Sequence, residues 1–473
     1  MKRTLTVILS LLILLPAFAA QEAEKKSAPV KEHLQNHFKI YGFIRNYFVF
    51  DSRESKAGTG DLFYYLPLDN KWNTSTLSNP AREDLNASPN FRFLALTSRV
   101  AFDVSGYYIN NLHFGAKVEG DFYSGLSKLT STTGLSGNTN VSGTAQARLR
   151  QAYVTLTWKD LAMKGEQTAQ VGLKIGQAWH PMAADMPHVF SLETGAPFGP
   201  FSRTPQVTVD ASLGKNWIVS ASAIWQQQYM SAGPDGASAS YQKYACTPEA
   251  YAGVSYKGKD FLVRGGVDVV SIKPRNIGKN ADGLTVHVKD RKTSVLGFLY
   301  GQYSYKMLQV KAKTTFGEGG EHMNLMSGYA VVDKSDPTNW KYASLINSSS
   351  WVSASYGKKW QGVLFLGYAK NFGLAKPAEE GYVKKSDVYF CSNGFSNINQ
   401  LYRINPQGLY NFGKFTVGVE YQWTAVQYGK YINGELKDTN ETVELLNGIG
   451  LPWQDTLHWV GNHRVNVMVK FTF

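Results

Sequence analysis

Apolar and polar residues alternate with a period of two along most of the chain after residue 37. In FKIYGFIRNYFVFD (38–51), Phe38, Ile40 and Phe48 fall on one face, and Lys39 and Arg45 fall on the other. Strict alternation of this kind is typical of a β-strand that has one apolar and one polar face. The pattern therefore predicts a chain built mainly of half-apolar strands.

The C-terminus continues this alternation to the last residue. In RVNVMVKFTF (464–473), one face carries the apolar residues Val465, Val467, Val469, Phe471 and Phe473. Chain ends are usually poorly ordered unless they are tied down. We therefore expect the last strand to pair with another strand. The aromatic residues Phe473 and Phe471 also resemble the signal that the barrel assembly machinery of the outer membrane recognises.

About sixteen strands are expected, separated alternately by tight turns and long polar loops. They start near Phe38, Phe91, Leu112, Ala145, Thr168, Thr204, Trp217, Thr247, Phe261, Thr293, Leu308, Ser350, Gln361, Gln400, Phe415 and Trp459. The tight turns include 214–216, 257–260, 306–307, 357–360 and 411–414. The long loops cover 51–90, 125–144, 179–203, 230–246, 274–292, 320–349, 373–399 and 429–458.

This regular alternation of connections predicts an all-β fold: a transmembrane antiparallel β-barrel over residues 38–473. Outer-membrane barrels have short periplasmic turns and long extracellular loops, whereas a soluble β-sandwich has no reason to place every long loop at one end. The mean hydropathy of −0.27 is that of a soluble protein. In a barrel, however, lipid-facing and water-facing residues cancel in any such average.

The N-terminus has the three parts of a secretory signal peptide. Residues 1–19 contain Lys2 and Arg3, an apolar stretch, and an A-x-A site at Ala17 and Ala19. The alternative, a membrane anchor, needs an apolar run of roughly 20 residues. Residues 20–37 are then a short periplasmic segment. These features predict export to the outer membrane of a Gram-negative bacterium, in contact with membrane lipids and lipopolysaccharide.

The charge balance does not indicate nucleic-acid binding. The formal net charge is +13, but the basic residues are scattered singly through apolar and aromatic strands. The two cysteines, Cys246 and Cys391, are too few for a disulfide framework. Whether they pair with each other is left open by the sequence.

Charged residues on the polar faces are expected to line a water-filled lumen, since an Arg or Lys facing mid-membrane lipid costs ~2–4 kcal/mol. The predicted pore-lining residues are Arg45, Arg99, Lys117, Glu119, Asp121, Arg148, Arg150, Lys174, Arg264, Asp268, Lys311, Lys313 and Arg403. Cations outnumber anions among them, which predicts a modest preference for anions.

Two strands depart from clean alternation. In ARLRQAYVTLTW (147–158), Arg148 and Arg150 share a face with Val154, so a β-bulge or a subunit contact is expected there. The stretch GVLFLGYA (362–369) is apolar on both faces, and we interpret it as a surface buried against neighbouring subunits.

The third long loop, 179–203, is rich in Pro, Gly and aromatic residues, a composition that suits a compact segment. Folded inward, such a loop would narrow the pore and set its size limit. The alternative is an outward surface loop. The candidate constriction residues are Trp179, His180, Asp185, His188, Glu193 and Arg203.

No motif for catalysis or cofactor binding is present. The sequence has no G-x-S-x-G, H-E-x-x-H or C-x-x-C pattern and no glycine-rich phosphate loop. The spacing of His180 and His188 does not require a metal site. We therefore expect no enzymatic activity, no cofactor and no bound metal.

Five short motifs resemble the DcaP-type outer-membrane porins, most strongly over residues 38–207. After the first strand come TSRVAFDV (97–104), KVEGDFYSG (117–125), ARLRQAYV (147–154), LKIGQAWHPM (173–182) and FSRTPQV (201–207), in the family's order. The resemblance implies a 16-stranded homotrimeric porin that passes small, often negatively charged solutes. It also implies that residues 179–203 fold inward.

The sequence thus predicts a porin for passive diffusion of small hydrophilic or anionic solutes. A substrate-specific channel for a sugar, dicarboxylate or aromatic solute is the first alternative, with Tyr123, Trp179 and Phe198 stacking the solute. An outer-membrane enzyme and a surface adhesin are further alternatives.

We expect deletion of Phe473 to reduce the amount of protein inserted into the outer membrane, because the assembly signal is lost. Quantitative immunoblotting of outer-membrane fractions would measure this, and the conductance of the molecules that do insert should be unchanged. Insertion at the normal level would refute the proposed signal.

Overall fold

A computed structural model of the chain describes residues 37–58, 63–73, 83–94, 98–123, 146–162, 168–191, 194–379, 383–391, 393, 395, 398–429, 432–435, 442–446 and 457–473. The expected signal peptide and nearly all of segment 20–37 lie outside these residues. Most of the loops at 125–144 and 429–458 lie outside them as well.

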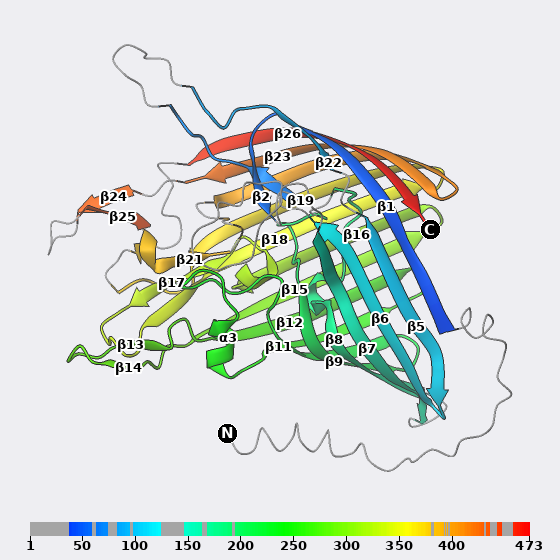
Figure 1. Ribbon diagram of the computed structural model, residues 1–473, viewed down its shortest axis with the longest axis horizontal. Coiled ribbons are helices and arrows are strands. Elements are labelled where there is room, and N and C mark those ends of the chain that lie inside the picture. The colour runs from blue at the N-terminus through cyan, green and yellow to red at the C-terminus, as the bar shows by residue number, and fades with distance from the viewer. Residues whose placement is uncertain are drawn as a thin grey trace.

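The described chain forms a closed antiparallel barrel of 16 strands (Figure 1). Its strands, in chain order, are β1 (Phe38–Asp51), β5 (Arg99–Ile109), β6 (Leu112–Tyr123), β7 (Gln146–Ala162), β8 (Thr168–Trp179), β9 (Arg203–Leu213), β10 (Trp217–Ile224), β11 (Glu249–Lys257), β12 (Phe261–Ile272), β15 (Lys292–Tyr305), β16 (Leu308–Glu318), β18 (Lys341–Gly357), β19 (Trp360–Leu374), β22 (Ile398–Phe412), β23 (Phe415–Tyr428) and β26 (His458–Thr472). The predicted fold class is confirmed.

Shorter elements occupy the long connections. They are β2 (Ser55–Gly58), β3 (Phe63–Pro67), β4 (Asn90–Leu94), β13 (Ile277–Lys279), β14 (Thr285–His287), β17 (Gly328–Asp333), β20 (Val383–Lys384), β21 (Val388–Phe390), β24 (Ile432–Glu435), β25 (Thr442–Leu446), the helix α3 (Ser240–Ala245) and the 3₁₀ turns η1 (Pro181–Ala183), η2 (Glu321–Met323) and η3 (Lys385–Asp387). In the described part of the chain, no helix is long and apolar enough to span a membrane.

The barrel closes between the first and last strands. β1 pairs with β26 from Phe43 opposite Thr472 to Asp51 opposite Arg464. Beyond that register, the backbones of Gly42 and Phe473 exchange hydrogen bonds of 3.2 and 3.1 Å. The chain terminus is therefore held in the sheet, as the regular alternation of the last strand predicted.

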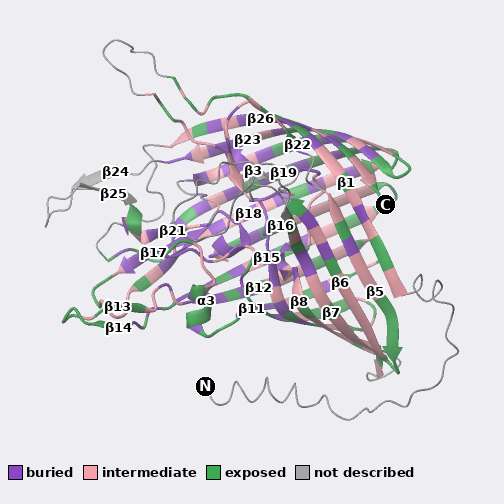
Figure 2. Cartoon of the chain, in the orientation of Figure 1, coloured by how far each residue is buried: buried purple, intermediate pink, exposed green. Residues whose placement is uncertain are grey.

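Buried and exposed residues alternate along many of the barrel strands (Figure 2). On β26, Val465, Val469 and Phe473 are exposed, whereas Arg464 and Asn466 are buried. Since these exposed apolar side chains lie on the outer surface of a closed barrel, they form the band that a lipid bilayer covers.

β1 is flanked by two short strands where the sequence predicted one. Its first half pairs with β5 and its second half with β4, which starts next to the expected Phe91. β4 and β5 thus both lie along the same side of β1.

The strand expected near Ser350 starts earlier, at Lys341, so the boundary predicted from the sequence is wrong here. The extension pairs with β17, and its residues Ala343 and Leu345 are buried in a separate apolar cluster with Val332 and Leu374. This packing above the barrel wall holds the extra residues in the strand.

A β-bulge in β7 explains why apolar and polar residues do not alternate regularly around Arg150. The pairing with β6 passes from Glu119 opposite Gln151 directly to Gly120 opposite Leu149, which leaves Arg150 without a partner in the ladder. Such an extra residue shifts the alternation of the strand. Arg150 and Gln151 are both buried, and the alternation of inward and outward residues reverses between Leu149 and Val154, which are both exposed.

The strand β19 is apolar on both faces for a different reason from the one expected. Its inner row, with Phe365 and Ala369 fully buried, packs against loop residues inside the barrel rather than against a neighbouring subunit. Phe365 lies with its ring centroid 6.0 Å from that of Phe198, which belongs to the third long loop.

We expect Gly42→Ala to weaken barrel closure. A Cβ at Gly42 would lie 2.2 Å from the backbone oxygen of Arg99 and 2.8 Å from the ring of Phe473, so the backbone of β1 would have to move away from β5 and the Phe473 ring at the seam would have to shift. Gly301→Ala is the matched control, because nothing lies within 4 Å of a Cβ at Gly301. The temperature at which the folded band disappears in semi-native electrophoresis should fall for Gly42→Ala only. Equal melting of both variants would contradict this account of the seam.

Candidate functional site

Five arginines lie on the part of the inner wall that runs from β1 to β9, and we call this set the arginine wall: Arg45 on β1, Arg99 on β5, Arg148 and Arg150 on β7, and Arg203 at the start of β9. The side chains of Arg99, Arg148 and Arg150 contact two carboxylates of β6, Glu119 and Asp121. Among these five described residues, cations therefore outnumber anions.

Arg148 and Arg150 form short ion pairs with the two carboxylates of this network. Arg150 lies 2.7 Å from Glu119 and 2.6 Å from Asp121, and Arg148 lies 2.8 Å from Asp121. Arg99 is more loosely placed, 3.8 Å from Glu119. Charge-assisted contacts of this length hold the guanidinium groups in fixed positions.

Arg45 and Arg203 are the remaining members of the arginine wall. Arg45 stands directly opposite Lys470 of β26 across the seam, and like charges placed so repel each other. The side chain of Arg203 is buried and donates from Nε to Gln228, while its Nη1 makes no hydrogen bond. Both Arg150 and Arg203 lie over the ring of Trp179, at 5.6 and 4.9 Å.

Residues 180–202, which connect β8 to β9, make contacts inside the barrel along its length. We call them segment 180–202. Asp185 lies 3.0 Å from Arg264 of β12, and the backbone oxygen of Met186 accepts a hydrogen bond from Lys311 of β16. Lys313, also on β16, donates to the backbone oxygen of Met182.

Further along, segment 180–202 contacts strands that are distant from β8 and β9, the two strands that it connects. His188 lies 2.5 Å from Gln309 of β16, and its amide donates to Ser353 of β18. Tyr47 of β1 donates to the backbone oxygen of Phe190. Arg403 of β22 donates to the backbone oxygen of Ala196. Burial and the nearby Lys311 ammonium lower the pKa of His188, so its ring is neutral near pH 7.

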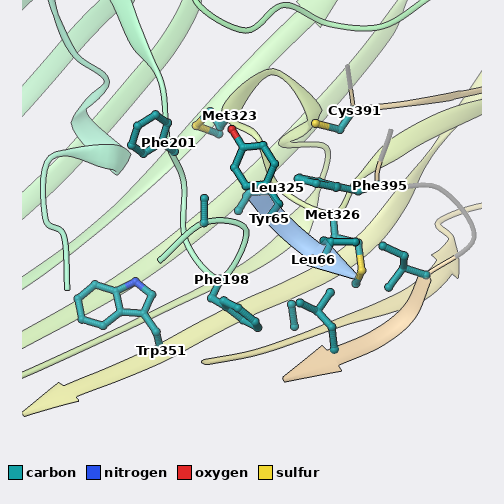
Figure 3. Close-up of a cluster of buried hydrophobic side chains, with 14 of the residues drawn as sticks. Tyr65, Leu66, Phe198, Phe201, Met323, Leu325, Met326, Trp351, Cys391 and Phe395 are labelled. Carbon is teal, nitrogen blue, oxygen red and sulfur yellow. The ribbon is translucent and has the colours of Figure 1, made fainter. Parts of the chain in front are cut away.

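An apolar core fills part of the lumen around this segment (Figure 3). Residues of several loops gather there, among them Tyr65, Phe198, Met323, Cys391 and Phe395. They pack against inward side chains of the wall, including Trp351, Phe365 and Tyr300. Sequence periodicity gave no sign of this core, because its loop members come from connections far apart in the chain. Cys391 is buried in it and Cys246 is exposed, so the two are not bonded to each other.

The predicted pore-lining residues therefore separate into groups. Arg264, Lys311, Lys313 and Arg403 contact segment 180–202, and Arg45, Arg99, Arg148 and Arg150 belong to the arginine wall. Lys117 lies 3.5 Å from Asp103, and Lys174 lies over the ring of Tyr153. Of the expected constriction residues, Trp179 and Arg203 contact the arginine wall, Asp185 and His188 contact β12 and β16, and Glu193 lies outside the described residues.

His180 and Asp268 lie together in a buried cluster that spacing along the chain did not reveal. Nε2 of His180 is 2.6 Å from Glu249 and 3.6 Å from Asp268, and His322 of η2 lies 3.2 Å from Glu249. The four side chains come from four different parts of the chain. The expectation of no metal site was based on local spacing alone.

Of the aromatic residues expected to stack a solute, Phe198 is fully buried and does not face open space. Trp179 is partly buried between the two arginines, and the side chain of Tyr123 lies outside the described part of the chain. Of the two whose side chains are described, Trp179 is the one placed where it could contact a solute.

The comparisons with known proteins identify the fold alone. No family model and no curated protein matches the chain. The outer membrane channel DcaP of Acinetobacter baumannii matches it with a TM-score of 0.59 at 16% identity, covering 92% of this chain and 97% of that one. The chain has the fold of that channel.

Weaker likenesses include an anion-selective porin from Comamonas acidovorans, with a TM-score of 0.49 at 8% identity, covering 92% of this chain and 99% of that one. OmpT, an outer membrane protein of Vibrio cholerae, has a TM-score of 0.49 at 11% identity, covering 92% and 97%.

We expect Phe198→Ala to lower the free energy of unfolding by about 3–5 kcal/mol, the usual loss for a buried Phe, because its ring fills space against Phe365 and Gly367. Urea unfolding in lipid vesicles would measure this. Leu364→Ala on the outer face of β19 is the control and should change the value by far less. Equal losses for the two variants would show that segment 180–202 adds nothing to stability.

Proposed function

We propose that the protein is a porin of the bacterial outer membrane that passes small hydrophilic solutes by passive diffusion, with a modest preference for anions. The barrel fold, its outward apolar band and the likeness to the DcaP channel support the general assignment. Passive diffusion requires no catalytic group, so this function needs neither a cofactor nor covalent chemistry.

The observation that carries the anion preference is the arginine wall. Three guanidinium groups surround two carboxylates there, and Arg45, Lys470 and Arg203 add further positive charge. Fixed cations along a pore lower the barrier for anions and raise it for cations. The carboxylates Glu119 and Asp121 neutralise only part of this charge.

We further propose that segment 180–202 narrows the pore. Its hydrogen bonds to β1, β12, β16, β18 and β22 support an inward position, and its packing against Phe365 would keep it from moving freely. In this arrangement the open path runs beside the arginine wall, with Trp179 at its edge. The size limit then depends on the distance between the segment and that wall.

The test is a planar-bilayer measurement of conductance and reversal potential under a KCl gradient. We expect anion selectivity in the wild type. A unit charge about 4 Å away in water is worth about 1 kcal/mol. The double variant Arg45→Gln/Arg203→Gln should therefore reduce the chloride-to-potassium permeability ratio by roughly two- to five-fold.

Lys215→Gln, in a tight turn between β9 and β10, is the matched control, because it removes one positive charge away from the arginine wall. It should leave the permeability ratio unchanged. Cation selectivity of the wild type would overturn the anion preference, and complete absence of channels would overturn the porin assignment.

A substrate-specific channel is the second candidate, and the position of Trp179 between Arg150 and Arg203 favours it. An indole ring flanked by two guanidinium groups suits a flat or sugar-like solute that carries an anionic group. Saturable block of the current by one such solute class would distinguish it from general diffusion. The homotrimer implied by the family resemblance stays a prediction.

A further inference from the structure

Four titratable side chains meet at one point inside the barrel, away from the arginine wall. His180 lies at the end of β8, Glu249 begins β11, Asp268 lies on β12, and His322 lies on η2. All four are at least nine-tenths buried, with relative exposures of 0%, 0%, 2% and 2% in that order. Two imidazoles and two carboxylates in so small a buried space form a typical donor set for a divalent metal ion.

The separations between the donor atoms fit one tetrahedral ion. Metal–ligand bonds of about 2.0–2.2 Å in a tetrahedron place neighbouring donors about 3.3–3.5 Å apart. Nε2 of His180 is 2.6 Å from Glu249 and 3.6 Å from Asp268. Nε2 of His322 is 3.2 Å from Glu249 and 3.8 Å from Asp268. The donor atoms of His180, Glu249 and Asp268 all lie within 4.8 Å of one another, and His322 approaches two of these three residues, so an ion among them requires the side chains to adjust their positions.

Unsatisfied polar atoms at the centre of the cluster are an independent sign of a ligand. Oδ1 of Asp268 and Nε2 of His322 make no hydrogen bond with the described residues, although both are buried. Buried polar atoms without partners are rare in folded proteins, since each carries an uncompensated loss of hydration. Oδ1 of Asp268 lies 3.6 Å from Nε2 of His180, and Nε2 of His322 lies 3.2 Å from Glu249, so one cation among these residues would satisfy both atoms.

Charge balance leads to the same conclusion. The described groups nearest the cluster besides its own four members are Glu321 and Lys292, which pair with each other at 3.1 Å. Two carboxylates with two neutral imidazoles have a charge of −2, which one divalent ion cancels. A buried carboxylate pair without such a counter-charge would be strongly unfavourable. Gln226 donates to the other oxygen of Glu249 at 3.4 Å and helps orient it.

The proton positions show what the ion would replace. Nδ1 of His180 accepts the amide hydrogen of Met182 at 3.2 Å, so the ring proton lies on Nε2 and is donated to Glu249. A metal bound at Nε2 would displace this proton, and Nδ1 would then carry the ring proton, so His180 would give up its contact with Met182.

We propose that His322, Glu249 and Asp268, with His180 as the fourth ligand, form a structural binding site for a divalent transition-metal ion, best matched by Zn²⁺. The ion would join both ends of segment 180–202 to the wall. His180 begins the segment, and near the other end the amide of Phe201 donates to the backbone oxygen of Met323, the residue after His322, at 2.8 Å. The site does not depend on the proposed channel function.

The test uses full-length protein without a histidine tag, refolded into detergent in the presence and absence of Zn²⁺, because the buried ligands are reached most easily before segment 180–202 is in place. After gel filtration, inductively coupled plasma mass spectrometry gives the zinc content per chain. We expect about one ion per chain. Refolding with Co²⁺ should give the intense visible absorption of a tetrahedral site.

His322→Gln and Asp268→Asn each remove one ligand with little change in shape and should lower the bound zinc to below about a tenth of an ion per chain. His180→Gln should weaken zinc binding by at least about ten-fold. The control is His287→Gln, because His287 is an exposed residue on β14. It should bind zinc like the wild type.

Semi-native electrophoresis shows for each variant that the barrel has folded before its zinc content is compared. Wild-type protein that retains no zinc would overturn the proposal. Zinc that persists in His322→Gln and Asp268→Asn, or is lost in His287→Gln, would overturn it too, since the metal would then be bound at the surface. None of these measurements involves ion conduction, so a failed site and a failed porin assignment remain distinguishable.

Discussion

Closure between β1 and β26 is the constraint on which the rest of the structure depends. In a lipid bilayer no water is available to hydrogen-bond the backbone, so an open sheet edge would leave a row of amides and carbonyls unsatisfied. The pairing from Phe43 to Asp51, extended by the Gly42–Phe473 contacts, removes that edge. Gly42 permits the close approach because a side chain there would meet both neighbouring strands.

Once the barrel is closed, the polar side chains of its inner row that are buried from water need partners inside the lumen. The cationic side chains of the wall find such partners in two ways. Arg264, Lys313 and Arg403 donate to segment 180–202, which brings its own carbonyl groups into the lumen. On the other part of the wall, Arg99 and Arg150 turn to carboxylates of the neighbouring strand. Cations of the same apparent type in the sequence thus have different surroundings.

The sequence predicted the fold well because the barrel is encoded locally. Residues two apart on β26 lie on the same face of the sheet, toward either lipid or the lumen. The alternation of apolar and polar residues therefore indicates which face is apolar. The boundary at Ser350 was missed because residues 341–349 are held by the distant Leu374 and Val332. The apolar core around Phe198 and the cluster of His180 with His322 were missed for the same reason. Their members meet only when separate loops enter one lumen, and no spacing along the chain records this.

The bulge at Arg150 divides β7 into two parts, in which opposite sets of alternate residues face the lumen. Before it, the even-numbered Arg148 points inward, and after it the odd-numbered Gln151 does so while Val154 points outward. The extra residue at the bulge thus changes which of the later side chains face the lumen and which face outward. If the same residues paired with β6 in regular alternation, without the bulge, Arg148 would face lipid and Leu149 would face the lumen. The charge of the lumen therefore depends on the position of this bulge as much as on the composition of the strand.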